Sequence, residues 1–291
     1  MCLSRMNGWK ACPMIAWILT SWISLVSCFA QAPAAPVAPA PAEDKETKPA
    51  AFKDVDGLLT RLEKVSKDTK TLHAKLTYDA IQGEVRDEQR RFGTLVYQAG
   101  PPARFGVHFD RIRSEKAGKK VTLPSNRWYI FDGKWLVEKL EDKDKKQFFK
   151  WQVVSPQTKD EDADPLALGR GPFVVPVALR KDLVTKKFDA DIAEPSEKSD
   201  PKNSVHLKLI PKKGVKMQFT MIDLWYDKDT LLPMRARASD DSKNESIIDL
   251  TEVQLNKPIE GNPLDTAAPQ ESGWEVQVTP WGGNGTGGGG K

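Results

Sequence analysis

The chain has few cysteines, the residues that a disulfide-bonded protein requires. It is 291 residues long and contains three cysteines, all near its start: Cys2, Cys12 and Cys28. If that leader is removed, the remaining chain can form no disulfide bond. We therefore expect its stability to come from an apolar core, which a chain of this length can bury easily.

Candidate catalytic and metal-binding groups are equally sparse. The three histidines stand singly, without a second ligand two or four residues away: His73, His108 and His206. No serine lies in a Gly-x-Ser-x-Gly turn. The acidic stretch 160–164 lacks the spaced glycine and distal glutamate of a calcium loop. We predict a protein without metal, cofactor or catalytic residues, and therefore not an enzyme.

An excess of one charge is also missing. There are 44 Lys and Arg against 40 Asp and Glu, a formal net charge of +4. Arg5 and Lys10 lie in the leader, so the charge falls to +2 without it. Composition therefore predicts no nucleic-acid partner.

Residues 1–30 have the layout of a bacterial secretory signal. Two basic residues precede the apolar run 11–26, and small residues follow it. We predict export to the periplasm. A permanent transmembrane anchor is the alternative, although the run is slightly short for one and is interrupted by hydroxyl residues.

Two processing sites fit the end of this leader. Residues 25–28 (Leu-Val-Ser-Cys) resemble a lipobox, in which Cys28 becomes a lipidated N-terminus. Residues 28–30 before Gln31 equally suit ordinary signal peptidase. The protein is therefore either tethered to a membrane through Cys28 or soluble after export.

Low-complexity segments flank the predicted domain. Residues 31–53 are rich in Ala and Pro and lack the apolar residues that could offset the entropy of ordering. Residues 281–291 are rich in glycine. We predict a disordered linker, one folded domain over 54–280, and a flexible tail.

The folded domain opens with a helix and continues with strands. Apolar residues recur at helical spacing from Val55 to Val65, and Asp54 can cap the helix. From Leu72 to Ala80 the period changes to two, and about nine to eleven short strands follow. Residues 165–188 read as a second helical stretch, broken by Gly and Pro.

The hairpin at residues 126–140 is the strongest local signal. Asp132-Gly133 is a turn dipeptide between two β-rich flanks. The first arm places Trp128 and Ile130 on one face, with the equally apolar Tyr129 and Phe131 on the other. Both faces must therefore be covered by protein or by a ligand.

These elements predict a mainly β protein with a few helices. Strands at hairpin spacing favour a single antiparallel sheet curled into an open, incomplete β-barrel, with the helices packed on one side. Such a sheet encloses either a packed core or a ligand cavity.

Four segments resemble the LolA/LolB-like family of periplasmic lipoprotein-binding proteins, in order and over residues 54–280. They comprise the opening helix and strand, a Gly-x-Leu strand with a following Pro-x-x-Phe, an Asp-Gly-Lys turn and a Leu-x-Pro-Lys-like strand end: Leu58–Tyr78, Gly93–Tyr97 with Pro102–Phe105, Phe131–Trp135, and Leu207–Lys212. Carrier members have an Arg that holds the lid before the Pro of the second strand's end. Gly100 and Pro101 stand there in this chain.

The resemblance implies an open half-barrel with a helical lid and a cavity that shields acyl chains. The protein would be a monomeric carrier, or a tethered receptor if Cys28 is acylated. Its partners would be acylated lipoproteins or lipids and inner- or outer-membrane sorting components. An envelope scaffold protein with a filled cavity and, less favoured, an envelope enzyme are the alternatives. We predict that the cavity is lined by large apolar residues: Leu76, Phe105, Val107, Phe109, Trp128, Tyr129, Trp135, Phe148, Phe219, Met221 and Trp225.

Overall fold

The structure is a computed structural model, and it describes residues 52, 54–83, 87–116, 118–157, 174–196, 198, 200–215 and 217–282. They belong to one compact unit, residues 48–291, which contains whole apolar clusters of its own and can therefore fold without the residues that precede it. The predicted leader with Cys28, almost all of the linker and the tail from 283 lie outside the described residues. Within the described residues, no helix has the length and apolar content needed to cross a membrane.

The predicted first helix is confirmed as α1, Val55–Asp68. Its N-terminus is capped by Asp54, whose carboxylate accepts a hydrogen bond of 2.6 Å from the Gly57 backbone N–H. Such a cap stabilises a helix by about 1 kcal/mol. The buried face of α1 carries Leu58, Leu59 and Leu62.

Twelve strands and a second helix, α2 (Lys181–Lys187), make up the rest of the described secondary structure. The strands are β1 Thr71–Gln82, β2 Asp87–Gln98, β3 Arg104–Lys116, β4 Lys119–Phe131, β5 Trp135–Asp142, β6 Lys145–Gln152, β7 Phe188–Ile192, β8 Ser204–Pro211, β9 Met221–Asp227, β10 Pro233–Ser239, β11 Glu245–Leu255 and β12 Glu275–Thr279.

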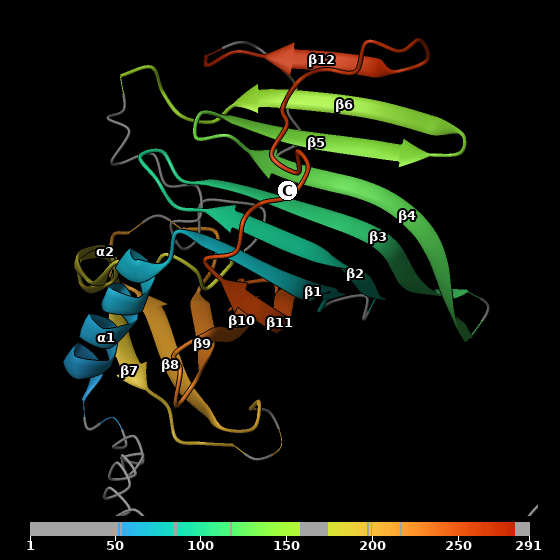
Figure 1. Ribbon diagram of the computed structural model, residues 1–291. Coiled ribbons are helices and arrows are strands. Elements are labelled where there is room, and N and C mark those ends of the chain that lie inside the picture. Colours follow the sequence, from blue (N-terminus) through green and yellow to red (C-terminus); the bar gives the residue numbers. More distant parts are fainter. Residues whose placement is uncertain are drawn as a thin grey trace, which may run out of the picture. The chain divides into compact units, whose positions relative to one another are not determined.

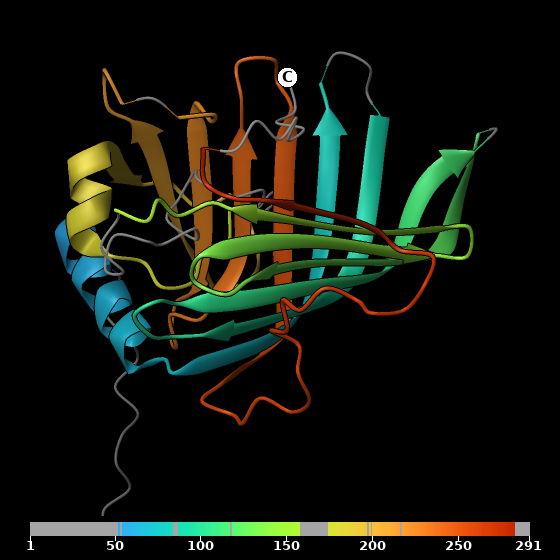
Figure 2. The same ribbon diagram turned by 90° about the horizontal axis from the view of Figure 1, so that it is seen from above.

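All twelve strands form one sheet in the order β12-β6-β5-β4-β3-β2-β1-β11-β10-β9-β8-β7 (Figure 1). The sheet is open, because β12 and β7 are its two edges. Strands at the β8–β11 end run across the direction of those at the β4–β6 end (Figure 2), as expected for a strongly twisted sheet. The predicted open, curled, mainly antiparallel sheet is confirmed, with one exception: β12 pairs with β6 in parallel.

The second helical stretch is shorter than we predicted. Residues 165–173 lie outside the described residues, and among the others only Lys181–Lys187 is helical. Phe188 already begins β7, a strand that the sequence reading missed. These residues form a strand because Phe188, Ala190 and Ile192 recur with period two and all pack against the same apolar cluster.

Three apolar clusters hold the sheet. The first joins α1 and α2 to β7–β10, and the second joins β11 and β1–β4. Ala236 of the first cluster pairs directly with Ile248 of the second, so both clusters lie on the same face. We call this the inner face. The third cluster, around Ile130, Val137 and Phe148, lies on the opposite or outer face.

The predicted hairpin is present, and its two faces separate as expected. Tyr129 and Phe131 pack in the second cluster, whereas Trp128 and Ile130 pack in the third. In the turn, the backbone N–H groups of residues 134 and 135 donate to Asp132 at 2.9 and 2.7 Å. A Cβ on residue 133 would lie 2.1 Å from Pro102, and its φ is +102°, so only glycine fits there.

Candidate functional site

The inner face carries a continuous apolar surface from one end of the sheet towards the other. Leu76 on β1 and Phe105, Val107 and Phe109 on β3 lie together in the second cluster. Each of these four side chains is at most 4% exposed. Four of the predicted lining residues are therefore neighbours on this face, and Tyr129 packs beside them.

The segment before α2 packs against this face. Val174 belongs to the first cluster, whereas Val175 and Val177 belong to the second. Val175 is 1% exposed. Ala178 has a φ of +55°, a left-handed conformation that costs a non-glycine residue on the order of 1 kcal/mol. The segment thus places small apolar side chains on the inner face at a local conformational cost.

The inner face is less deeply buried towards β5 and β6. Tyr129, Phe149 and Trp151 are only partly buried, and the rings of Phe149 and Trp151 stack with centroids 5.9 Å apart. The Tyr129 hydroxyl donates to Glu138 at 3.1 Å, and Arg127 lies 3.6 Å from the same carboxylate. Burial, reinforced by Glu138, raises the pKa of Tyr129, so this hydroxyl remains a neutral donor. These residues form an aromatic surface with a polar rim.

Other predicted lining residues lie on the outer face. Trp128 stacks on His108 at 4.5 Å, and Phe148 packs in the third cluster. Trp135 lies under the ammonium group of Lys150, 5.3 Å away. Alternation along β4, β5 and β6 directs these side chains away from the inner face. The prediction that they line one cavity together with Phe109 is therefore wrong for these three residues.

The predicted residues on and near β9 are also divided. Phe219 packs against the first cluster on the inner side. Trp225 points to the outer face, where it stacks on His206 at 4.2 Å. Met221 lies four residues before Trp225 on the same strand and therefore on the same face.

The sequence reading missed several inner-face residues. The predicted lining includes Phe148, whereas the inner face carries its neighbour Phe149 and, two residues further, Trp151. Val175 and Val177 lie in the stretch that the sequence predicts as a broken helix, but the chain is not helical there. Phe149 and Trp151 are two residues apart, so period-two alternation places them on one face. Which face that is depends on the pairing of Phe149 with Glu138, which only the tertiary structure shows.

The C-terminal segment, residues 257–274, covers part of the outer face before the chain enters β12 (Figure 1). Thr266 donates its hydroxyl to Asp132 at 2.9 Å, and Lys150 donates to the Thr266 carbonyl at 2.9 Å. A Cβ on Gly106 would lie 2.6 Å from the Pro263 carbonyl oxygen, which explains a glycine in the middle of β3. This part of the outer face is therefore occupied by the chain itself.

A groove of about 530 Å³ remains beside this segment. It lies over β1, β2 and β11, and its lining includes Lys75, Glu252 and Glu260. Lys75 and Glu252 form an ion pair of 2.6 Å that is well exposed to solvent. The lining of the groove thus combines charged and apolar side chains, unlike the inner face.

Farther along the outer face, paired charges cover the sheet. Asp223 is 1% exposed and accepts hydrogen bonds from His206 at 2.8 Å and from Arg237 at 2.7 Å. Burial alone would raise the pKa of Asp223, but these two hydrogen bonds outweigh it and hold the pKa below its usual value. Arg235 pairs with Asp249, and Arg90 with Asp79, so the carboxylates here are matched by cations.

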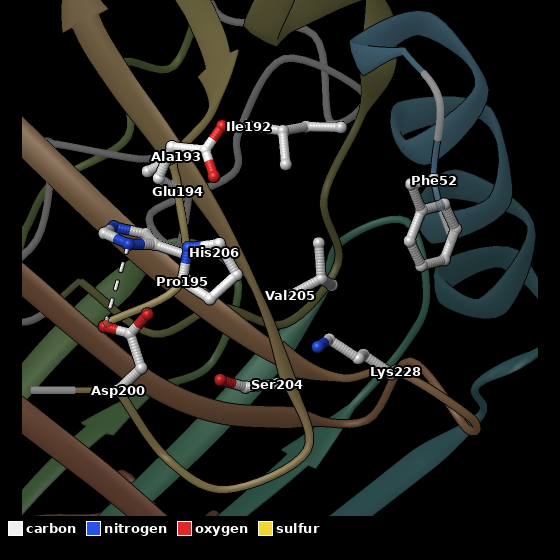
Figure 3. A pocket seen from close by; sticks show the side chains of 10 residues that line it. All are labelled: Phe52, Ile192, Ala193, Glu194, Pro195, Asp200, Ser204, Val205, His206 and Lys228. Carbon is white, nitrogen blue, oxygen red and sulfur yellow. Dashed lines mark ion pairs between the residues drawn. The ribbon is translucent and has the colours of Figure 1, made fainter. Parts of the chain in front are cut away.

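A pocket of about 300 Å³ lies at the β7–β8 edge (Figure 3). Phe52 and Val205 line the side towards α1, and His206 and Asp200 line the other. The His206 ring faces Asp223 with one nitrogen and Asp200, at 3.9 Å, with the other. Ser204 donates its hydroxyl to the Pro201 carbonyl. Because both ring nitrogens face carboxylates, this His and Ser are not arranged as a nucleophile and its base.

Two further expectations concern metals and the lid. No group of three or more His, Cys, Asp or Glu side chains is placed to hold a metal ion within the described ranges. Arg104, the basic residue nearest to the missing lid Arg, donates to Gln98 on β2 at 2.6 Å and points to the outer face. This hydrogen bond joins two neighbouring strands, so it does not hold α1 or α2 as the family's lid Arg would.

Comparisons with known proteins found no matching family model and no matching curated protein. The fold comparison returned, among others, a LolA superfamily protein from Nitrosomonas europaea, with 9% identity over 72% of this chain and 96% of that one and a TM-score of 0.32. It also returned an uncharacterised conserved protein from Thermus thermophilus (13% identity, 76% and 98%, TM-score 0.40) and a DUF1329 family protein from Desulfovibrio piger (13%, 72% and 95%, 0.33).

Proposed function

We propose that this protein binds the acyl chains of lipoproteins or other lipids on the inner face of its sheet and shields them from water. The supporting observation is that one face of a twelve-stranded open sheet is apolar from β4 through β1 to β8. Leu76, Phe105, Val107, Phe109 and Tyr129 form the proposed acyl-chain contact.

The energetics favour an acyl chain over the present cover. An acyl chain of about 16 carbons gains on the order of 12 kcal/mol when it leaves water, at about 0.8 kcal/mol per CH₂. Val175 and Val177 each contribute about 1.5–3 kcal/mol by being buried. The free energy gained by burying an acyl chain on the second cluster is therefore larger than the free energy lost by exposing these two valines.

The partly buried residues at β4–β6 form the proposed entrance. Phe149 and Trp151 give an acyl chain a first apolar contact, and Arg127 with Glu138 can bind the polar group that follows it. The acyl chain then extends towards Phe109, whose side chain is fully buried. No step of this binding requires chemistry, so we propose a carrier rather than an enzyme.

The proposed place of action is the periplasm, with acylated lipoproteins and membrane sorting components as partners. Metabolic labelling with a palmitate analogue, compared between the wild type and Cys28→Ala, distinguishes the two forms. Label that depends on Cys28 indicates a tethered receptor. Equal absence of label in both indicates a soluble carrier.

Binding is tested with residues 48–291 and a palmitoylated peptide carrying a fluorophore. We expect saturable binding, lipid co-purifying in native mass spectra, and at least about tenfold weaker binding in Phe149→Ser/Trp151→Ser, since each loses apolar contact. The matched control is Val276→Ser/Val278→Ser on the outer side of β12, where both side chains are exposed. Absence of both co-purified lipid and peptide binding would refute the proposal.

An envelope scaffold with a filled interior is the second candidate. It is favoured by the deep burial of Phe109 and Phe105, which are 0% and 2% exposed. For that function, Val175→Trp would only destabilise the fold. For a carrier, the larger side chain would also compete with the palmitoylated peptide and weaken its binding.

A further inference from the structure

The net charge of the chain is concentrated at the end of the β3–β4 hairpin. Residues 111–124 contain five Lys and Arg against one Glu, a net charge of +4. The rest of the chain has 39 Lys and Arg and 39 Asp and Glu, and is neutral. All of the excess positive charge therefore lies in 14 residues.

This end of the hairpin extends beyond its neighbours in the sheet. The pairing of β2 with β3 reaches only to Arg113, and the pairing of β4 with β5 begins at Arg127. The register of β3 shifts between Phe109 and Arg111 on both sides, as at a β-bulge, and a bulge bends the strand. β4 curves away from the sheet at this point (Figure 1). We call residues 111–124 the basic hairpin tip.

The tip has one apolar face. Ile112 pairs with Leu123, and Val121, two residues before Leu123, lies on the same face. Leu123 is 37% exposed, and Ile112 and Val121 are only partly buried. Aliphatic side chains are thus presented to solvent next to the cations.

Few of the described cations of the tip have an ion pair, although Glu115 lies directly opposite Lys120 on β4. Lys119 and Lys120 are exposed. The guanidinium groups of Arg111 and Arg113 lie 5.3 and 5.6 Å from the ring centre of Phe92, and Arg111 also pairs with Asp110. Contact with an aromatic face leaves the positive charge available to a larger anionic surface.

We propose that the basic hairpin tip docks on an anionic lipid bilayer, with Lys119 and Lys120 at the headgroups and Leu123 inserted among them. A bilayer interface offers anions and an apolar layer together, and so matches both sets of side chains. A nucleic acid would match only the charge, because the tip has no aromatic residue on which a base could stack. This proposal does not depend on acyl-chain binding by the inner face.

The test uses residues 48–291 and co-sedimentation with phosphatidylcholine vesicles, with and without phosphatidylglycerol. A Lys near an anionic surface strengthens binding about fivefold, so Lys119→Gln/Lys120→Gln should weaken the partition coefficient about 25-fold. Leu123→Ser should weaken it by a further factor of about five. The matched control is Lys202→Gln/Lys213→Gln, which removes the same charge from exposed lysines flanking β8 and should change binding less than about twofold.

Loss of binding in about 1 M salt, where the Debye length is about 3 Å, would support the electrostatic part. Three results would overturn the proposal: no binding to anionic vesicles at low salt, equal binding to vesicles without phosphatidylglycerol, or an equal loss in the control variant. Tighter binding to duplex or single-stranded DNA than to the vesicles would also overturn it, in favour of a nucleic-acid partner.

Discussion

The two faces of this sheet are made by the same strands and yet are covered in different ways. The inner face is apolar along most of its length and is covered by α1, α2 and the Val174–Leu179 segment. The outer face is divided between an apolar cluster under residues 257–274 and a row of paired charges around Asp223.

The difference indicates which face can exchange its cover. Dispersion and hydrophobic contacts are not directional, so under the proposed function an acyl chain would replace Val175 on the inner face. Hydrogen bonds to Asp223 or Asp132 have fixed geometry, and leaving them unmade is costly. The outer face is therefore specific for its own chain, whereas the inner face suits an exchangeable ligand.

The largest effect should come from the inner face. Phe109 is fully buried between the rings of Tyr78 and Tyr129, with centroid distances of 6.0 and 6.3 Å. We expect Phe109→Ala to lower the free energy of unfolding by about 3–5 kcal/mol in urea titrations. Val278→Ala on the exposed edge should change it by less than about 0.5 kcal/mol. A loss below about 1 kcal/mol for Phe109→Ala would show that the inner face is not tightly packed.

The next effect should come from the charged part of the outer face. Asp223→Ala leaves Arg237 and His206 without their shared acceptor. Because Arg237 is partly exposed, we expect a loss of about 2–3 kcal/mol at neutral pH, less than for a fully buried pair. Thermal unfolding of Ser239→Ala, a change at an uncharged position on the same face of the neighbouring strand β10, provides the comparison.

The pH dependence follows from the lowered pKa of Asp223. A carboxyl whose folded pKa lies below its unfolded value stabilises the fold fully above about pH 4 and loses that stabilisation as the pH falls through the folded pKa. Wild-type stability should therefore fall more steeply with acid than that of Asp223→Asn. Parallel curves in urea titrations from neutral pH to about pH 2 would contradict the assigned cause.

The smallest of the three effects should come from the C-terminal cover. Trp274 packs on the third cluster and is only partly buried, so Trp274→Ala should cost about 1–2 kcal/mol. Limited proteolysis should then cleave residues 257–282 sooner than in the wild type. Binding of the palmitoylated peptide should stay unchanged, and a parallel loss of binding would mean that the two faces are coupled.

Local patterns were sufficient for much of the fold. The spacing of Leu58, Leu59 and Leu62 predicts α1, and the Asp132-Gly133 turn predicts the hairpin with two covered faces. Each of these signals depends on residues close together in the chain, so it can be recognised without knowing which strands pair. The open sheet follows from the number and spacing of such strands.

The assignment of side chains to faces could not be predicted in the same way. Phe148 and Phe149 are adjacent and equally apolar, and only the pairing of β5 with β6 places one outside and the other inside. Trp225 looked like a lining residue, yet it is buried on the outer face by His206 and Arg237. Each apolar residue in a strand covered on both sides suits either face.

The sequence by itself determined the periods of the chain: one capped helix, many short strands, a turn that requires glycine, and an overall charge close to zero. The tertiary structure alone decided that β12 returns to pair with β6, that residues 257–274 lie on the outer face, and that the basic hairpin tip extends beyond its neighbours. Periodicity is local because it follows from backbone geometry, whereas pairing joins residues far apart in the chain and depends on the free energy of the whole sheet.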